Sequence, residues 1–189
     1  MTKYRIRSER YDCIVPMKEY LESCVDVPQF LGYCKQCSNY NRIWSCPSHD
    51  FDPETYFAAY SQIMIVGHKI ILPEELTRKV LTKEEQEPLL KDLLTEPKLT
   101  LDKEMLSLEK QHPGSRALSG GSCLYCSPGT CARISGEPCR FPEKMRYSIE
   151  ALGGNVGLTV TRYLHQELEW IEENHLPHHF ILVAGLLIK

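Results

Sequence analysis

The sequence predicts a single α/β (α+β) domain in which a central mixed sheet is flanked by helices and carries cysteine-rich metal-binding loops. Three observations lead to this class: apolar β-type runs, helical periodicity between them, and nine cysteines gathered in clusters. A chain of 189 residues has the length of one domain and buries about 70% of its unfolded surface. We therefore expect residues 1–189 to form one unit. Its parts are a first cysteine cluster at 34–46, a mainly helical scaffold at 47–122, a second cluster at 123–139, and C-terminal helices and a strand at 140–189.

Two apolar segments predict buried strands. Residues 60–72 are rich in Ile, Val and Met, and Gly67 within them predicts a bend. Residues 180–188 form the longest apolar run, and nine residues are too few to cross a bilayer. We expect a buried sheet and no membrane partner.

Helices are expected between and around these strands. Thr82 and Glu85 have the spacing of a capping box, and Pro88 is expected to limit or kink the helix that they begin. Pro142 suits the first turn of a later helix. Apolar residues at helical spacing predict three buried faces: Leu101, Met105 and Leu108 before a turn at 112–114; Met145, Ile149 and Leu152 after Pro142; and Leu164, Leu168 and Ile171 within 161–174.

The charge balance and the cysteine count define the chemical setting. Lys and Arg total 22 against 25 Asp and Glu, so the chain lacks the excess of positive charge that is typical of nucleic-acid-binding proteins. No apolar signal segment follows the N-terminus, and we expect a cytoplasmic protein whose thiols stay reduced. Clustered cysteines in that setting indicate metal or redox chemistry rather than disulfides.

The second cysteine cluster is the strongest signal, with the pattern C-x2-C-x4-C-x7-C. Four thiolates within 17 residues can converge on one centre, and iron–sulfur clusters are commonly held by four cysteines. We expect a [4Fe–4S] cluster here. Basic residues outnumber acidic ones nearby, and Arg140, beside the last cysteine, is the expected contact to the negatively charged cofactor. The four expected metal ligands are Cys123, Cys126, Cys131 and Cys139.

The first cluster has the pattern C-x2-C-x8-C-P and supplies Cys34, Cys37 and Cys46. These three thiolates hold a second centre or complete a shared one, and they are one ligand short of a full set. An iron left open in this way could bind a substrate. The sequence offers four sources for the missing ligand: Cys13, Cys24, His49 or a non-protein molecule.

Zinc is the main alternative metal, because four-cysteine zinc sites are often built from two C-x2-C knuckles. Cys34 and Cys37 could pair in this way with Cys123 and Cys126. That pairing leaves three cysteines of the two clusters unused. A redox dithiol is a further alternative, although no thioredoxin-like βαβ pattern surrounds either C-x2-C pair.

Two stretches, GYCKQCSNYNRIWSCPSHDFDPETY and GGSCLYCSPGTCARISGEPCRFPEKMRYSIEALGGNV, resemble a prokaryotic family of predicted metal-binding proteins. That family is the domain of unknown function 2284. The resemblance implies a small cytosolic metalloprotein in which the seven cysteines of the two clusters are ligands. Cys13 and Cys24 do not match its pattern, and Ser48 stands where the family usually has a second proline. The resemblance implies no particular reaction.

Three functions follow from these patterns. The first is an iron–sulfur protein that exchanges single electrons with a redox partner protein. The second is an iron–sulfur enzyme with an open iron at Cys34, Cys37 and Cys46. The third is a zinc-stabilised structural or interaction module. None of the patterns specifies an oligomeric state.

Overall fold

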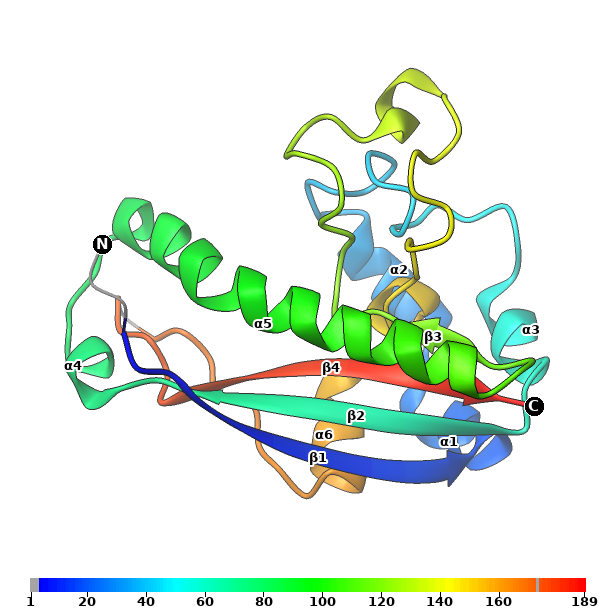
Figure 1. The fold of residues 1–189 in the computed structure, drawn as a ribbon, viewed down its shortest axis with the longest axis horizontal. Coiled ribbons are helices and arrows are strands. Elements are labelled where there is room, and N and C mark those ends of the chain that lie inside the picture. The colour runs from blue at the N-terminus through cyan, green and yellow to red at the C-terminus, as the bar shows by residue number, and fades with distance from the viewer. Residues whose placement is uncertain (1–3, 173) are drawn as a thin grey trace.

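Four strands form one sheet in the computed structural model, which describes residues 4–172 and 174–189 (Figure 1). The strand order is β1-β2-β4-β3. The bounds are Arg7–Pro16 for β1, Gln62–Ile71 for β2, Arg116–Leu118 for β3 and His179–Ile188 for β4. Helices cover this sheet within one domain, which confirms the α+β class and both predicted strands. The N-terminal strand β1 and the short β3 were not predicted.

The named strand pairs are all antiparallel, which corrects the expected mixed sheet. Pro16 at the end of β1 pairs with Gln62 at the start of β2. Ile71 at the end of β2 pairs with His179 at the start of β4. The chain thus re-enters the sheet at the end where it left, whereas a parallel pair needs a crossover to the opposite end.

One face of the sheet is covered by the long helix α5 (Lys83–Gln111) (Figure 1). The predicted capping box of Thr82 and Glu85 is present. The helix continues through Pro88 and Pro97, so the two expected helices are one. Each proline removes a single backbone hydrogen bond. Packing on the sheet holds the helix together, with Leu101 and Met105 almost fully buried against it.

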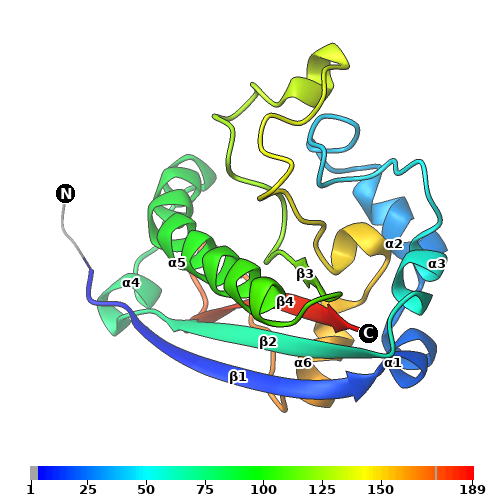
Figure 2. The same ribbon diagram turned by 45° about the vertical axis from the view of Figure 1, so that its right-hand side comes forward.

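The opposite face is covered by three shorter helices: α1 (Met17–Cys24), α3 (Pro53–Ala58) and α6 (Val156–Tyr163) (Figure 2). Successive side chains of β2 point to opposite faces of the sheet. Ile65 therefore packs in this core, and Val66 packs under α5. The buried Tyr20 hydroxyl lies 3.0 Å from that of Thr159 and links α1 to α6. Gly67 gives Leu164 room against β2, where a Cβ atom would lie 2.5 Å from the leucine Cδ1.

Two predicted helices are wrong in their bounds. The segment after Pro142 forms a turn and then only the short 3₁₀ helix η2 (Glu150–Leu152). It runs extended instead, because the N–H of Ser119 donates to the carbonyl of Tyr147 at 2.8 Å. The helix expected at 161–174 overlaps α6 over 161–163 only. The Asn155 side chain caps α6 earlier in the chain, α6 ends at Tyr163, and residues 165–172 are not helical, while residue 173 lies outside the described residues.

The remaining helices are α2 (Val27–Cys34) and α4 (Glu74–Thr77), together with the 3₁₀ helix η1 (Ala132–Ser135). In the described part of the chain, no helix is both long and apolar enough to span a membrane. Both cysteine-rich segments are mostly irregular. They lie side by side beyond the sheet, as both ribbon views show (Figures 1 and 2).

Candidate metal centre

The first cysteine group follows directly from α2. Asp26 caps this helix by accepting a hydrogen bond from the N–H of Gln29 at 3.0 Å, and the helix ends at Cys34. A tight turn follows, in which the Cys37 N–H donates to the Cys34 carbonyl at 3.0 Å. A second turn joins the Cys46 N–H to the carbonyl of Ile43 at 3.0 Å. The C-x2-C spacing thus becomes a compact chain reversal.

The three thiols of this group are electrostatic neighbours. The pKa of Cys46 is raised to about 11, mainly by burial and also by the nearby Cys37 and Cys34, against the effect of a hydrogen bond with Ser45. The pKa of Cys34 is also raised, first by burial and then by Cys37. Metal binding at such thiols must release protons, since the thiolate is the ligand.

The second group surrounds a cavity of about 460 Å³. All four of its cysteines line this cavity: Cys123, Cys126, Cys131 and Cys139. Trp44 of the first cysteine segment and Lys91 of α5 also line this cavity. Burial raises the pKa of Cys123, and Cys139 and Cys126 contribute to the increase, whereas Lys98 opposes it. The second group therefore faces one shared space.

The donor set fits a soft metal centre. All nine cysteines lie in the described part of the chain, and each is free of a disulfide. Within that part, no three Cys, His, Asp or Glu side chains stand close enough to share one metal ion. Four-cysteine zinc sites are built from the same thiolate ligands. Thiolates are also the usual ligands of iron–sulfur clusters, so the donor set fits either soft metal centre.

Arg133 joins the two cysteine groups. Its guanidinium, which extends from the second segment, donates to four oxygens of the first segment. The acceptors are the carbonyls of Ile43, Cys46 and Ser48 and the side-chain Oδ1 of Asn41. Because the planar guanidinium donates to several acceptors at once, it fixes the relative position of the two segments.

Further contacts reinforce this junction. The Cys123 N–H donates to the Oγ of Ser45 at 2.9 Å, and Ser45 is only 1% exposed. The Trp44 indole donates to the carbonyl of Glu137 at 3.0 Å. The thiols nevertheless interact most with their own group, as the causes of the pKa shifts of Cys46 and Cys123 show.

Arg140 forms a hydrogen bond with the backbone of the second cysteine segment. Its Nη1 donates to the Thr130 carbonyl at 2.9 Å, and the residue is exposed. It therefore contacts the backbone between Cys126 and Cys131, and it is absent from the described lining of the cavity. Its expected contact to a cofactor stays a prediction.

The three protein side chains expected as sources of a fourth ligand for the first group make other contacts. Cys13 packs against the core from β1, and Cys24 is buried in the same core at the end of α1. His49 places its Nε2 at 2.8 Å from the carbonyl of Ala151, and its ring stacks on Phe51 with centroids 4.8 Å apart. None of the three is an electrostatic neighbour that shifts the pKa of Cys34 or Cys46.

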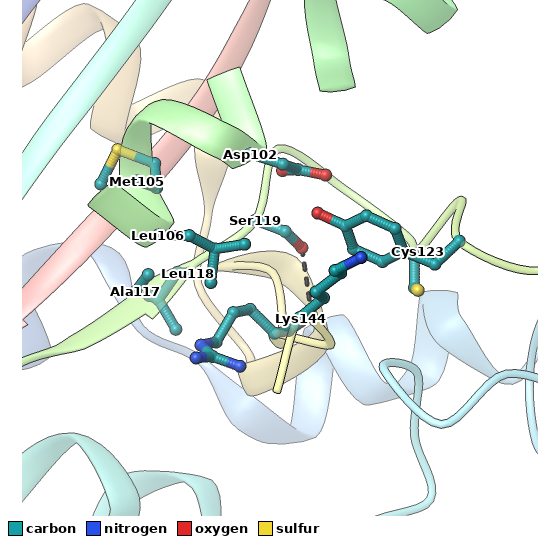
Figure 3. A pocket seen from close by; sticks show the side chains of 10 residues that line it. Asp102, Met105, Leu106, Ala117, Leu118, Ser119, Cys123 and Lys144 are labelled. Carbon is teal, nitrogen blue, oxygen red and sulfur yellow. Dashed lines mark hydrogen bonds between the residues drawn. The ribbon is translucent and has the colours of Figure 1, made fainter. Parts of the chain in front are cut away.

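Sequence reasoning missed Lys98 and Asp102 on α5. The Lys98 ammonium is buried, donates to the Ser122 carbonyl and lies 3.4 Å from the Asp102 carboxylate. Asp102 also accepts from the Gly120 N–H at 3.2 Å, so both residues hold the entry to the second loop. Figure 3 shows Asp102, Cys123 and Lys144 around a small pocket at this entry. In sequence, a Lys–Asp pair at i,i+4 cannot be told from an exposed ion pair.

Comparison with known proteins identifies the family. Neither a curated protein nor a solved structure matches the chain. The profile of the domain of unknown function 2284, described as a predicted metal-binding protein, matches residues 22–188. This match contains both cysteine groups and nearly the whole chain. The protein therefore belongs to this family of predicted metal-binding proteins.

Proposed function

We propose that this protein is an iron–sulfur electron carrier. In this proposal Cys123, Cys126, Cys131 and Cys139 hold a [4Fe–4S] cluster, and the first cysteine group holds a second metal centre. The observation that carries it is the single cavity that all four cysteines of the second group line. A cluster bound there supplies one-electron chemistry, and the fold supplies its position and electrostatic surroundings.

The charges around the second group support this role. A four-thiolate cluster is negatively charged, and Lys98 is close enough to lower the pKa of Cys123 against the dominant effect of burial. Lys144 borders the small pocket that Cys123 also lines (Figure 3). Cations beside a cluster stabilise its reduced, more negative state and so raise its reduction potential.

The position of the cavity suits exchange with a partner protein. Leu124 and Ile134 line it and are 40% and 46% exposed. Apolar side chains at the rim of a redox centre provide a contact surface through which an electron donor or acceptor can approach closely. We propose a redox protein as the partner.

Metal analysis of protein purified and reconstituted without oxygen tests the proposal. We expect iron and sulfide in equal amounts, about four of each per cluster, with absorption near 400 nm that bleaches on reduction. A redox titration should follow a one-electron slope of about 59 mV per tenfold change in ratio. Cys139→Ser should lose the second cluster, whereas Cys13→Ser, a matched cysteine in the sheet, should keep the full metal content.

Two outcomes would contradict this proposal. A colourless protein with stoichiometric zinc, unfolded by chelators and unharmed by air, indicates a zinc-stabilised module instead. Equal loss of metal in Cys13→Ser and Cys139→Ser would show that the assignment of the second group is wrong.

A further inference from the structure

We infer that the cavity at the second cysteine group also binds a small aromatic acid, whose carboxylate contacts Arg42 and Lys91. The inference goes beyond the electron carrier and shares only this cavity with it. It rests on the parts of the cavity wall that carry no cysteine. These parts combine two cations with aromatic and aliphatic side chains, which is the composition of a site for a small organic anion.

The cavity extends from the cysteine loop to α5. Glu87, Lys91 and Thr95 of α5 line it, and their spacing of four residues places them on one face of the helix. Residues 42–44 of the first cysteine segment supply a further part of the wall. The volume of about 460 Å³ lies within the range of about 300–1,000 Å³ that is usual for small-molecule sites. Since neither of these walls contributes a thiol, both are available to a ligand other than the metal.

The charged side chains of these walls favour an anion. Arg42 and Lys91 are both exposed, so a ligand can reach them from solvent. Neither has an ion-pair partner among residues 4–172 and 174–189, whereas Lys98 on the same helix pairs with Asp102 at 3.4 Å. Glu87 is the one carboxylate in the described lining, so the cations are in excess. A guanidinium matches the two oxygens of a carboxylate, and the lysine adds a second positive charge.

The apolar part of the lining favours an aromatic body for this anion. Trp44, Phe141 and Ile134 all line the cavity. The indole N–H of Trp44 already donates to the Glu137 carbonyl at 3.0 Å, so the ring rather than its polar atom is available to a ligand. Aromatic rings pack well against one another in offset or edge-to-face contacts. An apolar body also separates the carboxylate of the ligand from the thiolates of the second group, whose negative charge repels it.

Calorimetric titration of the full-length, metal-loaded protein tests the inference with phenylacetate, phenylacetamide and acetate. We expect phenylacetate to bind with one-to-one stoichiometry and at least about tenfold more tightly than either of the others, because only phenylacetate has both the charge and the ring. Arg42→Met and Lys91→Met should each weaken its binding by about three- to tenfold. Lys83→Met removes the same charge from an exposed position of α5 outside the described lining, and it should leave the affinity unchanged.

A second pair of variants tests the apolar contact. Ile134→Ser should weaken the binding of phenylacetate, whereas Ile171→Ser should not, although the two isoleucines are similarly exposed at 46% and 40%. Phenylacetamide that binds as tightly as phenylacetate would overturn the inference, as would equal effects of Lys83→Met and Lys91→Met.

The metal-free protein and the metal content of the variants separate this site from the metal centre. Arg42→Met and Lys91→Met should keep the full metal content, because neither removes a thiol. Loss of metal in these variants would overturn the inference, since the cations would then serve the metal centre. Binding of phenylacetate to the metal-free protein alone would also overturn it, because the metal would then fill the cavity. Finding zinc instead of iron overturns the electron carrier and leaves this binding test unaffected.

Discussion

The guanidinium of Arg133 lies over the indole ring of Trp44, with its Cζ atom 5.2 Å from the ring centroid. Arg133 follows Cys131 of the second group, and Trp44 precedes Cys46 of the first. The indole N–H in turn donates to Glu137, back in the second segment. The two cysteine segments therefore contact each other in both directions, and the two groups form one structural unit.

Arg133→Ala should weaken metal binding at both groups. The substitution leaves three backbone carbonyls and the Asn41 side chain without their charged donor. Such hydrogen bonds contribute about 1.5–3 kcal/mol each, so we expect the free energy of unfolding to fall by at least about 2 kcal/mol. Metal analysis and chemical denaturation measure the two effects.

Arg162→Ala is the matched control for this prediction. Arg162 also stacks on an aromatic ring, Tyr163, at 5.6 Å, but it is exposed and lies on α6. It should keep full metal content and lose less than about 1 kcal/mol. If Arg133→Ala removes metal from the second group alone, the two groups are independent and the prediction is wrong.

Gly153→Ala should separate η2 from α2. Gly153 has a φ of 88°, and the added Cβ would meet the Cα of Val27 at 2.7 Å. Gly129→Ala is the control, since Gly129 has a φ of 73° with nothing within 4 Å of its Cβ position. The control should lose about 1–2 kcal/mol from backbone strain alone, and Gly153→Ala should lose at least about 1 kcal/mol more. Thermal unfolding of the two variants measures the difference, and equal losses would show that the contact with Val27 is unimportant.

Lys98 and Asp102 should show strong coupling in a double-mutant cycle. Lys98→Met alone leaves the buried Asp102 carboxylate unpaired, and breaking a buried pair costs about 3–5 kcal/mol. Lys98→Met with Asp102→Asn should cost less than Lys98→Met alone, because the amide oxygen still accepts from the Gly120 N–H. Urea denaturation of Lys98→Met, Asp102→Asn and the double variant gives the coupling energy. Additive losses would indicate that the pair is solvated.

The local signals in the sequence predicted local features of the structure. The Thr82 capping box and the apolar run of β2 involve neighbouring residues, and both are present. The four cysteines of the second group line one cavity because short turns join them. Each of these features depends on spacing within a few residues, which the sequence displays directly.

Features set by distant contacts were not predictable in this way. The segment after Pro142 has helical spacing, yet Ser119 holds Tyr147 in an extended path. The buried Lys98 and the unpaired oxygen of Glu150 depend on which segments fold over them. Their chemistry is visible in the sequence, but their burial is a property of the assembled domain.

Glu109 should make the domain sensitive to acid. Arg146 donates to both of its carboxylate oxygens, at 2.7 and 2.6 Å, and the Ala117 N–H donates at 2.6 Å. Burial alone would raise the pKa of Glu109, but the hydrogen bonds from Arg146 and Ala117 outweigh it and lower the pKa. A lowered folded-state pKa means that this stabilisation is fully present above the unfolded value of about 4.3 and is lost as the pH falls through the folded value.

Glu109→Gln removes this ionisation, so it should cost about 2–3 kcal/mol at pH 7. The loss should shrink as the pH falls below about 4, because the unsubstituted protein then loses the same charge. Urea denaturation from pH 7 to pH 3 measures the difference between the two proteins, which cancels contributions from the metal sites. Glu75→Gln, an exposed substitution on α4, should show no such difference at any pH. A constant gap between Glu109→Gln and the unsubstituted protein would show that packing, rather than the charge of Glu109, stabilises this contact.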